Sequence, residues 1–107
     1  MNYVAVPNLH AETPIPEKGT HSHTLFSDDH LKIILFGFAP GAELKAHTAP
    51  MPVTIMILEG EATLTLGEDH MDAVPGTLVH MPPQLSHGIQ AKTPLRMLLY
   101  MHKSAKI

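Results

Sequence analysis

The spacing of turn-forming residues constrains this chain more than any other feature. Ten prolines and seven glycines divide it into short, mostly apolar runs, among them Leu31–Phe38, Val53–Leu58 and Leu95–Met101. Runs bounded in this way by Gly and Pro are typical of strands. No stretch keeps the 3.6-residue period of an amphipathic helix. We therefore predict an all-β domain, a sandwich or a closed barrel, with about eight to ten short strands.

The core of such a domain must be built mainly from aliphatic residues and methionine. Hydrophobic residues make up 44% of the chain, but only 5% is aromatic, and tryptophan is absent. The net charge is −3 and Lys and Arg do not cluster, which argues against nucleic acid and anionic membranes as partners. Cysteine is also absent. We therefore expect any metal site to use His, Asp or Glu.

A length of 107 residues predicts one domain. We expect residues 1–20 to form an N-terminal arm or an edge strand, with Val4–Val6 as the candidate strand. Residues 21–103 are predicted to form the barrel, and residues 104–107 a C-terminal tail. The N-terminus lacks the basic and apolar regions of a signal peptide, and no apolar run reaches membrane-spanning length. We therefore expect a cytoplasmic protein.

Two stretches of the chain each combine strand-like runs, a Pro-containing turn and one central histidine. The first, Gly41–Gly60, carries His47, and the second, Gly76–Ala91, carries His87. If both stretches form strand pairs of one barrel, the two imidazoles reach a common interior. We therefore predict a binding site inside the barrel.

These two stretches resemble the paired motifs of the cupin superfamily. Gly41 and His47 match the first motif with five residues between them, and Leu58-Glu59-Gly60 matches its end. Gly76, Pro82 and His87 match the second motif. The chain is thus identified as a small single-domain cupin of the cupin-2 type. The resemblance implies an RmlC-like double-stranded β-helix, or jelly-roll barrel, a homodimer and a concave interior site.

The metal-binding parts of both motifs are degenerate in this sequence. Alanine and valine replace the second histidine and the glutamate of the first motif, and glutamine and alanine replace the glycine and asparagine of the second: Ala49, Val53, Gln84 and Ala91. Of the four ligands typical of the family, only His47 and His87 remain. A divalent transition metal such as zinc, iron, nickel or manganese would need a further ligand. His80 and Glu43 are the candidates, if they point inward.

Structural interpretations stand beside these functional ones. A histidine in an apolar pocket is often simply hydrogen-bonded there, and His21 and His23 are interpreted as strand or interface residues. The methionines are interpreted as adaptable core residues rather than as soft copper ligands. This applies to Met51 and Met81 as well, although both flank the predicted site.

The sequence is compatible with three functions. The first is a binding barrel in which an apolar pocket, predicted to include Ala49, Val53, Ile55 and Ala91, holds a small molecule oriented by the two histidines. The second is a metal-dependent dioxygenase or isomerase with an incomplete ligand set. The third is a metal-free acid–base epimerase, which is disfavoured because no orienting acid lies near either histidine in the sequence. The apolar strands Leu31–Phe38 and Leu95–Met101 also predict a homodimer.

Overall fold

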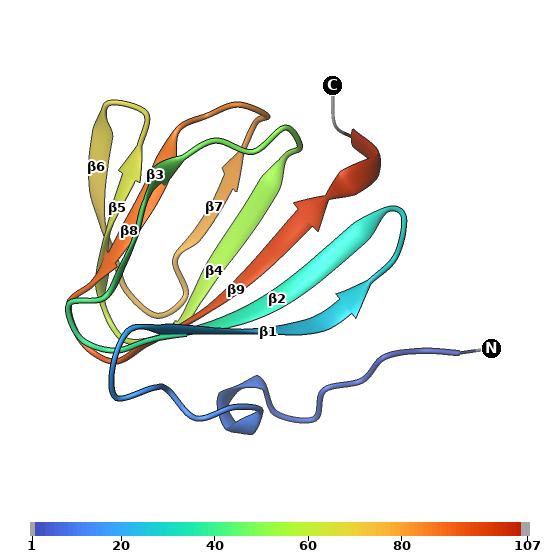
Figure 1. The fold of residues 1–107 in the computed structure, drawn as a ribbon, viewed down its shortest axis with the longest axis horizontal. Coiled ribbons are helices and arrows are strands. Elements are labelled where there is room, and N and C mark those ends of the chain that lie inside the picture. Colours follow the sequence, from blue (N-terminus) through green and yellow to red (C-terminus); the bar gives the residue numbers. More distant parts are fainter. Residues whose placement is uncertain (1, 106–107) are drawn as a thin grey trace.

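The structure, a computed structural model, describes residues 2–105 and is built from two antiparallel sheets (Figure 1). The five-stranded sheet contains, in spatial order, β1 (Thr20–Ser27), β2 (Leu31–Phe38), β9 (Leu95–His102), β4 (Val53–Glu59) and β7 (Leu78–Met81). The four-stranded sheet contains β3 (Glu43–His47), β8 (His87–Ala91), β5 (Ala62–Leu66) and β6 (Asp69–Ala73). Two short 3-10 turns, η1 (Leu9–Ala11) and η2 (Lys103–Ala105), are the helical elements of these residues.

This architecture confirms the prediction of an all-β jelly-roll barrel. From β3 to β9 the chain crosses from one sheet to the other at every connection except the β5–β6 hairpin, and the two sheets enclose a common interior (Figure 1). Of the predicted C-terminal tail, residues 104 and 105 belong to η2, and residues 106–107 lie outside the described part. Within residues 2–105, no helix is long and apolar enough to cross a membrane.

The core lies between the two sheets because their strands alternate apolar and polar side chains. Val53, Ile55 and Ile57 of β4 point inward and are buried, whereas the residues between them are half-buried on the outer face. Ala62 and Leu64 of β5 meet them from the facing sheet. Full burial stabilises each large aliphatic side chain by about 1.5–3 kcal/mol relative to leaving it exposed to water.

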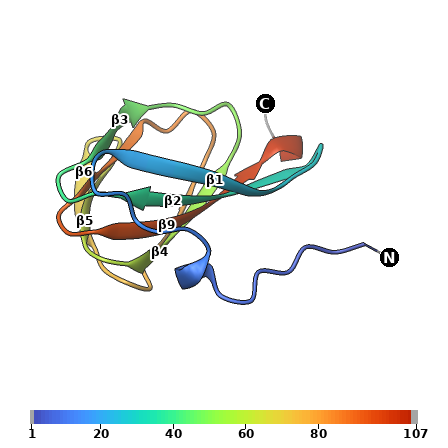
Figure 2. The same cartoon turned by 60° about the horizontal axis from the view of Figure 1, so that its bottom comes forward.

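The N-terminal arm covers part of the outer face of the five-stranded sheet (Figures 1 and 2). Its residues 4–6 are extended and do not pair as a strand. The arm passes over Gly37, where a Cβ would lie 3.0 Å from the Cδ of Pro16. Gly37 therefore allows close approach of the arm, and it pairs regularly with β1 and β9 rather than forming a bulge. This cover explains why Leu35 and Leu98 are buried although they face away from the barrel interior.

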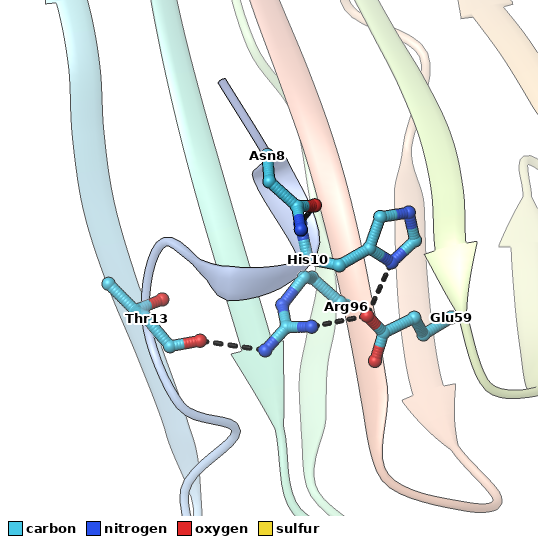
Figure 3. Close-up of polar contacts among 5 residues, drawn as sticks. All are labelled: Asn8, His10, Thr13, Glu59 and Arg96. Atoms are coloured by element: carbon cyan, nitrogen blue, oxygen red, sulfur yellow. Dashed lines mark hydrogen bonds and ion pairs between the residues drawn. The ribbon is translucent and has the colours of Figure 1, made fainter. Parts of the chain in front are cut away.

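An ion pair fixes the arm to the sheet (Figure 3). Arg96 is the one buried charged residue among those described. Its guanidinium binds the carboxylate of Glu59 and donates a 2.7 Å hydrogen bond to the carbonyl of Thr13. The same carboxylate accepts a 2.5 Å hydrogen bond from Nδ1 of His10. These contacts therefore connect β4 and β9 of the sheet with His10 and Thr13 of the arm.

Candidate functional site

A bulge at the end of β3 sets the direction of His47. Leu44 pairs with Ile89 and His47 pairs with His87, and the register shifts between these two pairs. A bulge inserts an extra residue and redirects the side chains that follow it. Leu44 and His47 consequently both line the interior cavity, although they are three positions apart in the strand.

The two histidines of the motifs lie side by side at the mouth of this cavity. Their ring centroids are 4.4 Å apart, and the ring planes are inclined by 55°. His47 is exposed and His87 is half-buried. The structure therefore brings together the two residues that the sequence predicts for the site.

The backbone fixes the tautomer of each neutral imidazole. Nδ1 of His47 lies 2.9 Å from the carbonyl oxygen of Lys45, and Nδ1 of His87 lies 2.9 Å from that of Leu85. A carbonyl oxygen only accepts, so Nδ1 must donate its proton in both cases. The unprotonated nitrogen of each neutral ring is therefore Nε2, the atom that is free to accept a proton or to bind a cation.

The cavity behind the histidines is small and apolar. Its volume is about 120 Å³, and its walls come from both sheets. Aliphatic side chains from β2, β4, β5 and β9 form most of the lining, together with three methionines: Ile34, Ile55, Leu64, Leu66, Leu99, Met81, Met97 and Met101. Of the predicted pocket residues, Ile55 lines the cavity, Val53 and Ala91 are buried in the core, and Ala49 packs against that core.

The donor set does not fit the metal that the cupin resemblance implies. Among residues 2–105, no group of three or more His, Cys, Asp or Glu side chains is placed to hold a metal ion. Val53, at the position of the family's glutamate, is only 2% exposed and offers no oxygen. A site for zinc or iron uses about three protein ligands, so two imidazoles are too few.

Neither candidate for a further ligand points into the cavity. Glu43 pairs with Gln90 on the outer face of the four-stranded sheet, because the bulge in β3 puts it on the face opposite to His47. His80 pairs with Thr54 on the outer face of the five-stranded sheet. There the Thr54 hydroxyl contacts Nδ1 of His80 at 2.7 Å and Nε2 of His102 at 2.9 Å.

His21 and His23 lie on β1 and pair with outward-facing positions of β2. His23 lies 3.9 Å from the Glu12 carboxylate of the arm. Both histidines are therefore remote from the cavity. The strand role expected for them agrees with this position.

The family model of the cupin domain matches residues 34–101 of this chain. None of the curated proteins matches it. A conserved protein of unknown function from Streptococcus pyogenes has a similar structure, with 27% identity, a TM-score of 0.85, and coverage of 96% of this chain and 90% of the other. A cupin superfamily protein from Desulfitobacterium hafniense is 27% identical at a TM-score of 0.83, with coverage of 91% and 88%. A salicylate 1,2-dioxygenase variant from Pseudoaminobacter salicylatoxidans shares the fold at 13% identity, a TM-score of 0.75, and coverage of 81% and 28%.

Proposed function

This chain belongs to the cupin family, and we propose that its barrel interior binds one small guest between the imidazoles of His47 and His87. The observation that supports this most is the orientation of the two rings. Both Nδ1 atoms are used by backbone carbonyls, so two Nε2 lone pairs are left at the mouth of an apolar cavity. His47 is exposed and His87 is half-buried, so a guest that displaces water from these nitrogens must replace the hydrogen bonds that water gives them.

The guest must therefore offer hydrogen-bond donors or a positive charge to the two acceptor nitrogens. A cation or a group with N–H or O–H donors satisfies both nitrogens at once. A carboxylate does so only if an imidazole is first protonated. The site thus favours a cation or a neutral donor over an anion.

The size of the cavity limits the guest further. A volume of ≈ 120 Å³ compares with about 30 Å³ for one water in the liquid. It lies well below the 300–1,000 Å³ typical of sites for drug-sized ligands. The guest is therefore an ion or a molecule of a few non-hydrogen atoms, and any part beyond the histidines meets aliphatic walls.

Binding of simple probes tests this proposal. The probes are Zn²⁺, Cu⁺, methylammonium and acetamide, and the readout is the ¹⁵N resonances of the imidazoles with calorimetry of the same samples. We expect at least one probe to shift both His47 and His87, with binding lost in His47→Phe and His87→Phe. His30→Ala, in the exposed turn before β2, is the matched control and should bind as the wild type does. If every probe leaves both rings unshifted, or if both variants bind normally, the proposal is refuted.

We also propose that the protein is a homodimer formed through the outer face of the five-stranded sheet. The part of this face beyond the arm carries apolar side chains, and Leu78 is 61% exposed there. Light scattering after size exclusion should give twice the chain mass of 11.7 kDa. A mass equal to that of one chain at micromolar concentration would contradict the dimer.

A further inference from the structure

Two thioethers occupy the wall of the cavity at the level of Val53. In the register of the five-stranded sheet, Val53 lies directly opposite Met81 on one side and Met101 on the other. Directly opposed residues of an antiparallel pair share one face of the sheet. Met81 and Met101 both line the same cavity as the two histidines.

The loops of the barrel bring these groups to the same end. His47 ends β3 just before the loop that leads to Val53 at the start of β4, and Met81 ends β7 just before the loop that leads to His87. Figure 1 shows the β3–β4 and β7–β8 loops at one end of the barrel. Imidazoles on the four-stranded sheet and thioethers on the five-stranded sheet therefore line this end together.

This set of donors is neutral and soft. It contains imidazole nitrogen and thioether sulfur, and no carboxylate or thiolate of the described residues joins it. Thioether sulfur selects Cu(I) among the biological metals, whereas Mg²⁺, Ca²⁺ and Mn²⁺ prefer oxygen ligands. A single positive charge is also less costly to bring into an apolar cavity than a double one, because the desolvation penalty rises steeply with charge.

We propose that the guest of the barrel interior is a Cu(I) ion held by His47, His87, Met81 and Met101. This inference rests on the proposed function, since it names the guest of the same site. It also gives Met81 and Met101 a role beyond filling the core. Valine in place of the family's glutamate at position 53 then shifts the metal preference of the site from hard divalent ions to a soft monovalent ion.

Met97 supplies a control within the same cavity. It lines the cavity but pairs with Phe36 and Ile57, four residues along β9 from Met101. That separation is about 13 Å along a strand. Met97 therefore lies toward the other end of the barrel and should not reach an ion held beside the histidines.

The test is a competition between the tag-free protein and a coloured Cu(I) chelator, bicinchoninate, under anaerobic reducing conditions. We expect one Cu(I) per chain in the wild type and in Met97→Leu. Met81→Leu and Met101→Leu should each lower the affinity by about tenfold or more, which is the scale on which coordination partners act. Leucine nearly conserves the volume of methionine, and thermal unfolding of each apo variant verifies that it is folded. X-ray absorption of the wild-type complex should show copper–sulfur scattering, and the double methionine variant should lose it.

The outcomes separate the two proposals. If the His47→Phe and His87→Phe variants lose Zn²⁺ or acetamide binding while the methionine variants keep Cu(I) at wild-type affinity, the interior site stands and the copper assignment fails. If Cu(I) binds no more tightly than Zn²⁺, or if its absorption spectrum lacks sulfur scattering, the copper assignment also fails. If the histidine variants retain every probe, both proposals are refuted.

Discussion

Replacing Glu59 with glutamine and replacing Arg96 with methionine break the same ion pair, but we expect the two changes to differ in cost. The Arg96 side chain is 7% exposed and that of Glu59 is 33% exposed. A guanidinium cannot lose its charge at any ordinary pH. Glu59→Gln therefore leaves a buried cation without its counter-ion. Arg96→Met leaves a carboxylate that water can still reach.

The magnitudes follow from this difference in burial. Removing one partner of a buried pair costs about 3–5 kcal/mol, and a glutamine oxygen retains one hydrogen bond, so we expect about 3 kcal/mol for Glu59→Gln. Arg96→Met removes charged hydrogen bonds but keeps the apolar stem, and the hydrogen bond from His10 to Glu59 survives. We expect about 1.5 kcal/mol for this change. The double variant, which has neither charge, should be more stable than Glu59→Gln alone.

Urea unfolding at pH 7 measures these free energies, with Glu68→Gln in the exposed β5–β6 turn as the charge-matched control. Hydrogen exchange adds a local readout, because residues 10–16 of the arm should lose protection in both variants before the barrel does. Should Arg96→Met cost as much as Glu59→Gln, or should the double variant be the least stable, the argument from burial is refuted.

Three further predictions concern the same fold and site. The pKa of Glu59 is lowered from 4.5, because burial raises it but the hydrogen bond from His10 and the attraction and hydrogen bond of Arg96 outweigh burial. The stability advantage of the wild type over Glu59→Gln should thus be complete above pH 4.5 and shrink as the pH falls through the lowered pKa, as urea unfolding at pH 7 and pH 3 would show; an advantage that grows in acid would contradict this. Gly60 has a φ of +83°, and a Cβ there would overlap the carbonyl oxygen of Pro94, so Gly60→Ala should cost at least about 2 kcal/mol in the same assay; a cost below that would show that the turn can relax. Val53→Glu should lower the melting temperature of the apo protein, because it buries a carboxylate without a partner, and Zn²⁺ should restore much of the loss; no recovery with Zn²⁺ would mean that position 53 does not face the two histidines.

The barrel could be predicted from the sequence because its signals are local. Pro and Gly mark the strand ends, and the alternation Ala62, Leu64, Leu66 identifies the inner face of β5. The motif spacing also identified His47 and His87, which end β3 and begin β8 at the same end of the barrel. These features depend on neighbours in the chain and need no knowledge of tertiary contacts.

The directions of the other candidates depended on features that the sequence does not mark. Glu43 and His47 are four positions apart and would face the same side of a regular strand, but the bulge between them puts their side chains on opposite faces. His80 could be placed only by knowing that Met81 faces inward. The role of Met101 became visible only in the register of β9 with β4, which places it beside Val53.

The position of the N-terminal arm could not be predicted from the sequence for a different reason. The sequence predicts an arm or an edge strand, and the choice depends on contacts between residues far apart in the chain. Arg96 binds the carbonyl of Thr13, and Glu59 binds His10. None of these side chains follows a local pattern that distinguishes an anchor from an ordinary surface charge.

The central claim is that both Nε2 atoms are free acceptors at the mouth of the cavity. Long-range ¹H–¹⁵N correlation of the apo protein at pH 8 measures this directly, with His47→Phe and His87→Phe to assign the signals. We expect both rings as Nδ1–H tautomers with unprotonated Nε2, and a guest should shift Nε2 while Nδ1 stays protonated. Nε2–H tautomers in either ring, or Nε2 signals that no cation or donor probe shifts, would contradict the account.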